Sequence, residues 1–294
     1  MSALFKKIFM VLIGILAGIA SWAIIEICLY YGELIGRHIV WNGLTGAFIG
    51  LIFGFFFSSA EGVMFSNSSR AIQGGIIGSI LGFLGGAAAM ILSQWLLYAL
   101  INTEMFTKDV TNNLMLPLSR AVGWGILGVV VGSLDGLRGG SARRTFVGIT
   151  GGLIGGFIGG LLLEFLTRRW SNGLLARGTG IILMGIGIGL FLAIFEYSRS
   201  FGILKILTGP YKGKDYVLIM KNTRIGSSLT AHVPLVGYSG VRKNHALFVA
   251  GKNGVIIKKE EGPVMVNDKP VTERELKYED VIQIGSAKIL YLPK

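Results

Sequence analysis

The sequence predicts two structural parts: an all-α, glycine-rich membrane bundle of about six helices, followed by a small all-β sandwich. The chain is 52% hydrophobic, with a mean hydropathy of +0.64 and 45 glycines among 294 residues. Several uncharged segments exceed the roughly 18 apolar residues that indicate a membrane span. After Tyr211, charged residues become frequent and apolar residues alternate with polar ones, as in β-strands. We therefore expect a transmembrane domain at 1–205, a linker at 206–214 and a β-sandwich domain at 215–294.

Six apolar segments are expected to cross the membrane. Lys6 and Lys7 precede the first, as in a signal peptide, but an apolar run of about 20 residues favours a retained helix. The segment 101–114 is compatible with either a loop or a surface helix. The six segments lie at 8–31, 39–58, 71–101, 115–134, 145–167 and 174–196.

The distribution of basic residues predicts the orientation. Six spans place both termini on one side of the membrane, and the loops on that side carry more Lys and Arg than the opposite loops. Since cytoplasmic loops are enriched in these residues, the chain is expected in the inner (plasma) membrane with both termini cytoplasmic. The first side holds Lys6, Lys7, Arg70, Arg138, Arg143, Arg144, Arg199 and Lys205; the second holds Arg37, Lys108, Arg120, Arg168, Arg169 and Arg177.

An internal repeat joins the helices into hairpins. An acidic residue precedes a basic one by nine positions three times, and glycines follow the first two basic residues at every fourth position. The repeat pairs are Glu61 with Arg70, Asp135 with Arg144, and Glu196 with Lys205; the glycines are Gly74, Gly78, Gly82 and Gly86, then Gly148, Gly152, Gly156 and Gly160.

The first helix looks like the displaced half of the third copy, because Lys6 is followed by Gly14 and Gly18 at the repeat spacing. The sixth and first helices would then form a third hairpin, which predicts a closed bundle with pseudo-threefold symmetry. Glycine every fourth residue allows helix backbones to touch, as in a glycine zipper. A glycine-lined pore or a subunit interface in a homo-oligomer would use the same stripes.

Charged residues in the spans are candidate functional sites. The repeat pairs would form salt bridges that close the cytoplasmic turns, or a ring of charges around a lumen. Glu26 and Glu164 lie 20 residues past their basic residues, near the outer helix ends, and Arg120 lies at a similar depth and could pair with one of them. They either reach the lipid headgroups or serve ion or proton passage.

The tail contains short strand-like runs separated by turn signals, including Asn253-Gly254 and Asn267-Asp268. The strings "RIGSS", "VRKNHALF", "VMVNDKPV" and "LKYEDVIQIG", in this order, resemble a forkhead-associated (FHA) domain over about residues 212–292. The resemblance implies a β-sandwich whose loops at one end bind phosphothreonine peptides of a protein partner phosphorylated by a Ser/Thr kinase.

The tail departs from the family at the phosphate contacts. Ser227 stands where the family has arginine, and Arg242 stands where it has serine. An asparagine–glycine pair of the family corresponds to about Gly262-Pro263, while His245, which supports the loop, is kept. The phosphopeptide-binding candidates are Ser227, Ser228, Arg242, Lys243, His245 (structural) and Asn267. Binding of an unphosphorylated partner or of the membrane domain, and a purely structural cap, are the alternatives.

No catalytic motif, cofactor site or metal-ligating cluster is predicted, and no nucleic acid partner. Cys28 is the single cysteine. The expected function is an integral membrane signalling or scaffold protein that presents an FHA-like domain to the cytosol, where it recruits a protein partner, with membrane lipids as the other contact. The alternative is a channel- or transporter-like membrane module regulated by the FHA-like domain. The expectation is that the chain is not an enzyme.

Overall fold

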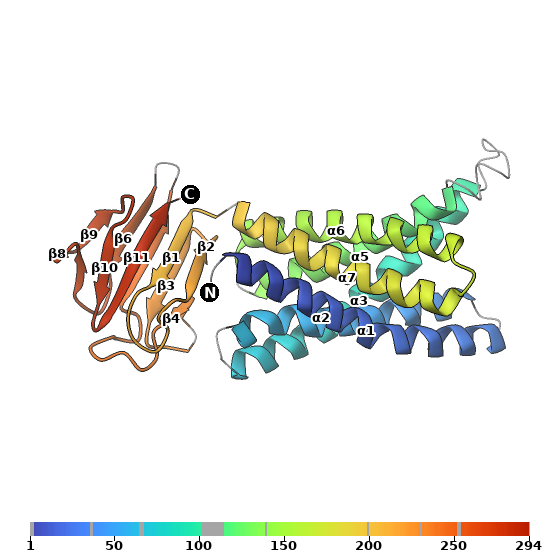
Figure 1. The fold of residues 1–294 in the computed structure, drawn as a ribbon, viewed down its shortest axis with the longest axis horizontal. Coiled ribbons are helices and arrows are strands. Elements are labelled where there is room, and N and C mark those ends of the chain that lie inside the picture. Colours follow the sequence, from blue (N-terminus) through green and yellow to red (C-terminus); the bar gives the residue numbers. More distant parts are fainter. Residues whose placement is uncertain are drawn as a thin grey trace. The chain divides into compact units, whose positions relative to one another are not determined.

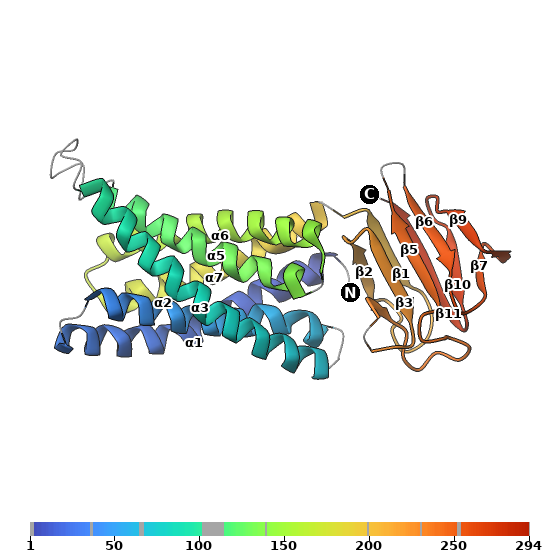
Figure 2. The same cartoon turned by 180° about the vertical axis from the view of Figure 1, so that it is seen from behind.

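The computed structural model describes residues 3–293 except 36–37, 65–67, 102–114, 139, 199, 230 and 252–253. The chain divides into a helical unit and a β unit, each described by itself (Figures 1 and 2). The segment 101–114, left open as loop or helix, lies almost entirely outside the described residues. The described helices are α1 (Ala3–Ile35), α2 (His38–Met64), α3 (Ser68–Ile101), α5 (Leu116–Arg138), α6 (Ala142–Arg169) and α7 (Gly173–Ser198).

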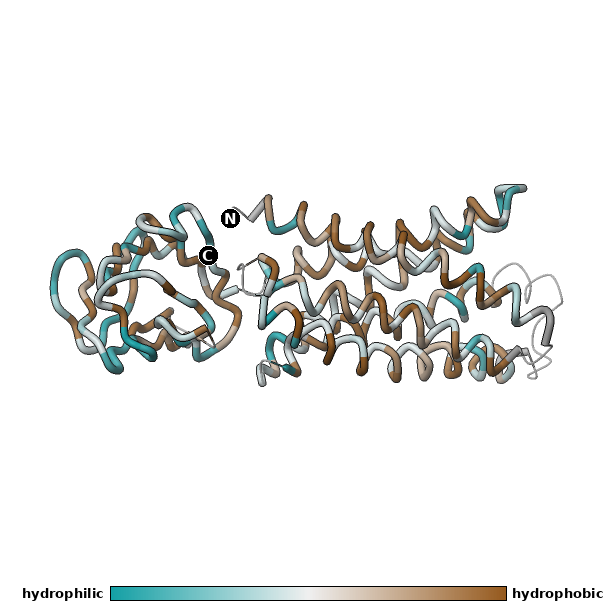
Figure 3. Tube along the Cα trace, turned by 90° about the horizontal axis from the view of Figure 1, so that it is seen from below, coloured by the Kyte–Doolittle hydropathy of each residue, from teal (hydrophilic) through white to brown (hydrophobic). Residues whose placement is uncertain are grey.

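Among the described residues, six helices are long and apolar enough to cross a membrane. Figure 3 shows hydrophobic residues along the length of these helices, with hydrophilic residues concentrated toward their ends. The predicted fold class, six long apolar helices followed by a β-sandwich, is confirmed.

The helices pack as pairs whose backbones touch at glycines. In each of three pairs, a Cβ on one glycine would overlap the carbonyl oxygen of a glycine on the other helix, so no other residue fits without moving the helices apart. The contacts are Gly54 with Gly78 between α2 and α3, Gly128 with Gly152 between α5 and α6, and Gly185 with Gly14 between α7 and α1.

The core of the helical unit is apolar. Side chains next to the contact glycines of α2, α5 and α7 are buried in one hydrophobic cluster, and those one turn further along are buried with them. These apolar side chains form the centre of the bundle at this level. The first set is Phe53, Leu127 and Met184; the second is Phe57, Val131 and Ile188.

The β unit is a sandwich of two sheets, with strand orders β2-β1-β11-β10-β7-β8 and β4-β3-β5-β6-β9. Inward-facing residues alternate with outward-facing ones, as in β5, where alternate residues are buried. The strands are β1 (Gly202–Ile206), β2 (Asp215–Leu218), β3 (Asn222–Gly226), β4 (Val233–Pro234), β5 (Ala246–Ala250), β6 (Val255–Lys259), β7 (Val264–Val266), β8 (Lys269–Val271), β9 (Glu273–Glu275), β10 (Val281–Ile284) and β11 (Ala287–Pro293).

The sandwich begins earlier than the expected start at residue 215. Strand β1 pairs with both β2 and β11, so it is an interior strand of its sheet. The expected linker at 206–214 is the end of β1 and its turn into β2. Tyr238 fixes this turn, since its hydroxyl donates to the carbonyl of Thr208 at 2.6 Å and accepts from the N–H of Tyr211 at 3.0 Å. Burial raises the pKa of the Tyr238 hydroxyl.

The turn signals of the tail lie where strands reverse. Asn267 and Asp268 have φ of 51° and 60°, which a tight turn between β7 and β8 requires. The other expected turn, at Asn253-Gly254, connects β5 to β6, but Asn253 lies outside the described residues.

Candidate functional site

One end of the sandwich is formed by the loops at 227–232, 235–245 and 260–263. The three loops meet there because β3 and β6 end, and β5 and β7 begin, at the same end of the sandwich. The predicted residues Ser227, Ser228, Arg242, Lys243 and His245 all lie in these loops or next to them.

His245 ties two of these loops together from inside. The ring is fully buried, and its Nδ1 accepts from the backbone N–H of Arg242 at 3.0 Å. Nε2 therefore carries the proton and donates to the carbonyl of Pro263 at 2.9 Å. A Cβ at Gly262 would overlap the imidazole ring, so the glycine at this position is required by the histidine. His245 thus has the structural position expected from the resemblance.

The exchanged serine and arginine are backbone neighbours. The N–H of Ser227 donates to the carbonyl of Arg242 at 2.9 Å, and the next bond in the ladder joins the N–H of His245 to the carbonyl of Ile225. A Cβ at Gly226 would overlap the carbonyl of Lys243, so the loops cannot lie closer. Positions 227 and 242 therefore form one backbone-bonded pair. This pair carries one guanidinium and one hydroxyl whichever of the two positions holds the arginine.

Two basic side chains at this end of the sandwich are exposed to solvent. Arg242 and Lys243 are exposed, and within the described residues neither side chain has an ion-pair partner. The nearby carboxylates are already engaged, since Glu260 pairs with Arg224 at 3.3 Å and Glu261 accepts from the side-chain and backbone nitrogens of Asn244, both at 3.2 Å.

Glu261 and Asn244 were not among the predicted site residues. Their two hydrogen bonds close the 242–244 loop onto the 260–263 loop and so fix where Arg242 and Lys243 project. The sequence separates them by 17 positions, and only the pairing of β5 with β6 brings them together.

The prediction for Asn267 is wrong. Strand β7 begins next to Pro263, where Val264 pairs with Ile284. Asn267 follows the other end of the strand, where its N–H donates to the carbonyl of Val281. Its amide holds the turn at that end: Nδ2 donates to Asp280 at 2.7 Å, and Oδ1 accepts from the N–H of Val281 at 2.9 Å. Asn267 is therefore a turn residue and not part of the loop end that carries Arg242.

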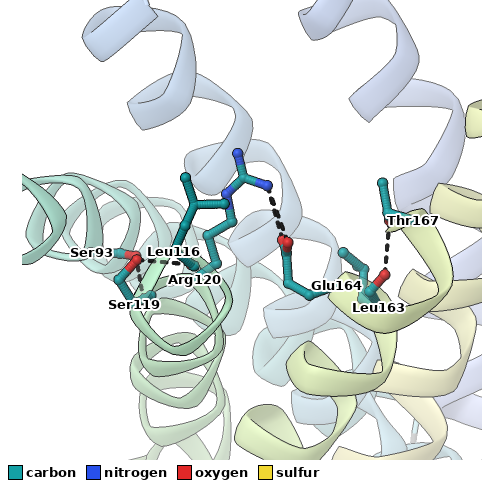
Figure 4. Close-up of polar contacts among 7 residues, drawn as sticks. All are labelled: Ser93, Leu116, Ser119, Arg120, Leu163, Glu164 and Thr167. Atoms are coloured by element: carbon teal, nitrogen blue, oxygen red, sulfur yellow. Dashed lines mark hydrogen bonds and ion pairs between the residues drawn. The ribbon is translucent and has the colours of Figure 1, made fainter. Parts of the chain in front are cut away.

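A second group of polar residues lies at one end of the helical unit. Nη1 of Arg120 on α5 lies 3.2 Å from both carboxylate oxygens of Glu164 on α6 (Figure 4). Arg177 on α7 binds Glu26 on α1 through two hydrogen bonds, of 2.8 and 2.6 Å. The predicted intramembrane charges thus form pairs between helices, and Arg177 is the partner that the sequence analysis did not single out.

Two of the repeat acids contact basic residues outside the expected pairs. Glu61 on α2 contacts Arg138 at 3.4 Å and Arg144 at 3.3 Å, which belong to the α5–α6 pair. Glu196 on α7 pairs with Lys6 of α1. Arg70 lies near the start of α3, and the side chain of Asp135 lies outside the described residues.

The assignment of Lys205 to the third repeat pair is wrong. Lys205 is in strand β1, where it lies opposite Asp215 of β2 and Leu290 of β11. It is thus part of the sandwich, and the first helix supplies the base near Glu196. The nine-residue spacing from Glu196 to Lys205 therefore does not mark a third turn, because the chain leaves the helical unit after α7.

Comparison with known proteins identifies the β unit. The FHA domain family model matches residues 223–285, and a search of curated proteins found no match to the chain. The chain is similar to the FhaA FHA domain, solved in complex with the intracellular domain of Rv3910, at 25% identity over 31% of this chain and 98% of that chain (TM-score 0.29).

Two further solved structures are similar. The FHA domain of the CT664 protein from Chlamydia trachomatis is 21% identical over 32% of this chain and 97% of that chain (TM-score 0.30). The N-terminal FHA domain of Rad53p from S. cerevisiae, solved with a phosphothreonine peptide, is 14% identical over 32% and 93% (TM-score 0.29). The β unit of this chain therefore carries an FHA domain at residues 223–285.

Proposed function

We propose that the chain is a membrane-anchored adaptor whose FHA domain binds a phosphothreonine-containing protein partner. The observation that carries the proposal is the hydrogen bond between the N–H of Ser227 and the carbonyl of Arg242, at 2.9 Å. A phosphate dianion is bound by a guanidinium fork together with one or two hydroxyl or amide donors. The exchanged positions offer this set from two loops in backbone contact, with Lys243 adjacent.

The same loops would bind an unphosphorylated partner if the displaced guanidinium no longer reached the phosphate. The family's asparagine is absent, and the 260–263 loop is used to hold His245 and Asn244. Fewer peptide-backbone contacts are then available, so the phosphate must supply a larger share of the affinity. Phosphate dependence is therefore the property to measure.

The test measures binding of the full chain, in neutral detergent, to a fluorescent phosphothreonine peptide library and to the same library without phosphate. We expect phosphate-dependent binding that falls at least about tenfold in Arg242→Ala, because charge-assisted hydrogen bonds contribute roughly 1.5–3 kcal/mol. Arg242→Lys, which keeps the charge without the fork, is expected to bind at an intermediate level.

Two further variants sharpen the result. Lys269→Ala removes an exposed cation from β8 and is expected to leave binding unchanged. The double variant Ser227→Arg with Arg242→Ser restores the family arrangement and is expected to keep phosphate-dependent binding. Equal binding of both libraries, or loss in the double variant alone, would contradict the idea that the exchanged pair reads phosphate.

The orientation that this function requires has both termini in the cytosol. Six helices that each cross the membrane return the chain to its starting side, and the count of basic residues favours that side as cytoplasmic. An enzyme reporter that is active only in the cytosol, fused after Lys294, is expected to be active. If a reporter fused at the same position were active only when it lies outside the cytosol, the adaptor proposal would be contradicted, since cytosolic partners could not reach the domain.

We further propose that the helical unit is a pseudo-threefold repeat of three hairpins joined by glycine zippers. If the contacts Gly54–Gly78, Gly128–Gly152 and Gly185–Gly14 are equivalent, then Arg120 and Arg177 each lie eight residues before the first glycine. Glu164 and Glu26 each lie twelve residues after the second, so the two ion pairs are also equivalent.

This register differs by one turn from the expected one. Gly54, Gly128 and Gly189 each lie seven residues before a repeat acid, so the sequence spacing aligns these three glycines. The backbone contacts instead align Gly185 with Gly54 and Gly128, and Gly189 meets Met10. Glycines at 185 and 189 fit either alignment in the sequence alone. The helix contacts support the second alignment, because Gly185 meets the backbone of a glycine, Gly14, whereas Gly189 meets the backbone of Met10.

A channel- or transporter-like role has less support. The buried layers at Phe53, Leu127 and Met184 are apolar. The polar residues of the spans gather toward the bundle end that holds Arg120 and toward the one that holds Glu61. An ion path would have to open the layer between these groups.

A further inference from the structure

A cavity of about 560 Å³ lies in the helical unit, at the end where Arg120 and Glu164 meet. Side chains from all six helices line it, including Asn42, Gln94 and Arg177. Its volume is in the range of pockets that hold small molecules. It lies entirely within the helical unit, so nothing about it depends on phosphopeptide binding.

Two arginines and one carboxylate line the cavity, and the carboxylate of Glu26 outside the lining neutralises Arg177. Arg120 and Arg177 line it, while Glu164 is the single acidic residue among the lining side chains. The side chain of Arg120 is 52% exposed and that of Glu164 6%. The carboxylate is therefore enclosed by its arginine, while the guanidinium remains open.

Arg120 keeps unused hydrogen-bond donors. Within the described residues, its Nη1 alone is engaged, by the two oxygens of Glu164. Figure 4 shows that the rest of the guanidinium is directed away from Glu164. Nε and Nη2 together present the two-donor edge that matches a carboxylate or a phosphate. The amide nitrogen of Gln94 adds a donor nearby, since that side chain uses its oxygen to accept from Asn42 at 2.9 Å.

The remaining wall is apolar because the α2–α3 hairpin lacks the ion pair. The positions equivalent to Arg120 and Glu164 are Gly46 and Met90, where a Cβ on Gly46 would overlap the Met90 side chain. Glycine and methionine fill less of the end of the bundle than an arginine–glutamate pair. Ile49, Met90 and Trp124 form part of this wall.

We propose that this cavity binds an anionic amphiphile, with a carboxylate or phosphate head on Arg120 and an apolar chain against Met90 and Trp124. A cation is disfavoured, because Glu164 and Glu26 are each held by an arginine. A neutral apolar molecule would leave the open edge of Arg120 without a partner in a site of low polarity, which is costly. The open donor edge of Arg120 and the apolar wall together favour an anionic head group that carries an apolar chain.

The test uses quenching of Trp124 fluorescence in the full chain in neutral detergent. The probes are 9,10-dibromostearate, with a carboxylate head, and a dibrominated lysophosphatidate, with a phosphate head; the matching dibrominated alcohol is the neutral probe. Bromine quenches tryptophan only at close range, and the Trp124→Phe variant supplies the background from the other tryptophans. We expect saturable quenching by at least one anionic probe and only the background with the alcohol.

The variant that isolates the charge is Arg120→Gln combined with Glu164→Gln, which keeps the net charge of the pair and leaves no buried carboxylate. It is expected to weaken probe binding by at least about tenfold. Arg169→Gln removes an exposed cation from the end of α6 outside the cavity and is the matched control. Unfolding of each variant by SDS, followed by circular dichroism, shows whether the fold is retained.

Three results would overturn the proposal. The alcohol could quench Trp124 as well as the anions, the double variant could bind with unchanged affinity, or no probe could quench above the Trp124→Phe background. Displacement of the anionic probe by inorganic phosphate alone would overturn the requirement for an apolar chain and would instead indicate a site for a water-soluble anion.

Discussion

Replacement of Gly50 by alanine tests whether glycine contacts hold the helical unit together. A Cβ at Gly50 on α2 would overlap the carbonyl oxygen of Gly82 on α3 and lie 2.8 Å from its carbonyl carbon and 3.0 Å from the Cα of Gly86. Carbon atoms pack best at roughly 3.5–4.0 Å, so the two helices must separate by about 1 Å, and a gap of that size loses a quarter to a half of each contact energy. All three contacts are to backbone, which cannot rotate away.

We expect Gly50→Ala to lower the free energy of unfolding by about 1–2 kcal/mol. Overpacking costs roughly 1–3 kcal/mol, and the better helix propensity of alanine offsets up to about 1 kcal/mol of it. Gly43→Ala in the same helix is the matched control, since its Cβ meets the flexible Ile91 side chain at 3.4 Å. That variant is expected to be neutral or up to about 1 kcal/mol more stable.

The assay is SDS-induced unfolding of the full chain followed by tryptophan fluorescence. All five tryptophans precede residue 196, so the signal reports the helical unit and not the FHA domain. Equal stability of Gly50→Ala and Gly43→Ala would refute the reasoning, because the two variants differ in what the added methyl group meets and not in helix propensity.

Three further predictions concern the β unit, each measured by urea unfolding of the full chain followed by far-UV circular dichroism. His245→Phe leaves the N–H of Arg242 and the carbonyl of Pro263 without partners and is expected to cost on the order of 2–4 kcal/mol. Tyr238→Phe removes a hydroxyl that serves two backbone groups and is expected to cost about 1–2 kcal/mol. Burial raises the pKa of Asp215, so its contribution to stability falls as the pH rises from the unfolded pKa through the folded pKa; Asp215→Asn should remove this fall.

The outcomes that would contradict these predictions differ. A His245→Phe protein as stable as the original would mean that the loops are held by other contacts, such as those of Glu261. An unchanged Tyr238→Phe would mean that water replaces its hydroxyl. If Asp215→Asn had the same dependence of stability on pH as the original protein, other carboxylates would be responsible for that dependence. Lys205 would then cancel the effect of burial on the pKa of Asp215, since its charge lowers this pKa.

The positions of the helices and the class of the β unit follow from the sequence because each rests on local patterns. Uncharged runs of sufficient length form helices in a membrane wherever they occur. The FHA resemblance rests on short strings whose local geometry limits the residues allowed. Asn267-Asp268 forms a turn with positive φ, and Gly226 lies against the backbone of Lys243. His245 was recognised in the same way.

The misassigned residues have a common cause. Lys205 matches the repeat spacing, but β1 is an interior strand of the sandwich. Asn267 lies in one of the strings that resemble the FHA family, but at the end of β7 remote from Arg242. Spacing along the chain carries no information about which element a residue joins once a strand pairs with distant strands.

The sequence alone determined that this chain has six long apolar helices with glycine stripes and an FHA domain at its C-terminal end. Only the tertiary structure decided that Ser227 and Arg242 are backbone neighbours, that Arg177 is the partner of Glu26, and that α1 and α7 touch at Gly14 and Gly185. The reason is physical. Hydropathy and turn chemistry are properties of adjacent residues, whereas hydrogen bonds and backbone contacts between residues 15 to 171 positions apart depend on how complete elements pack.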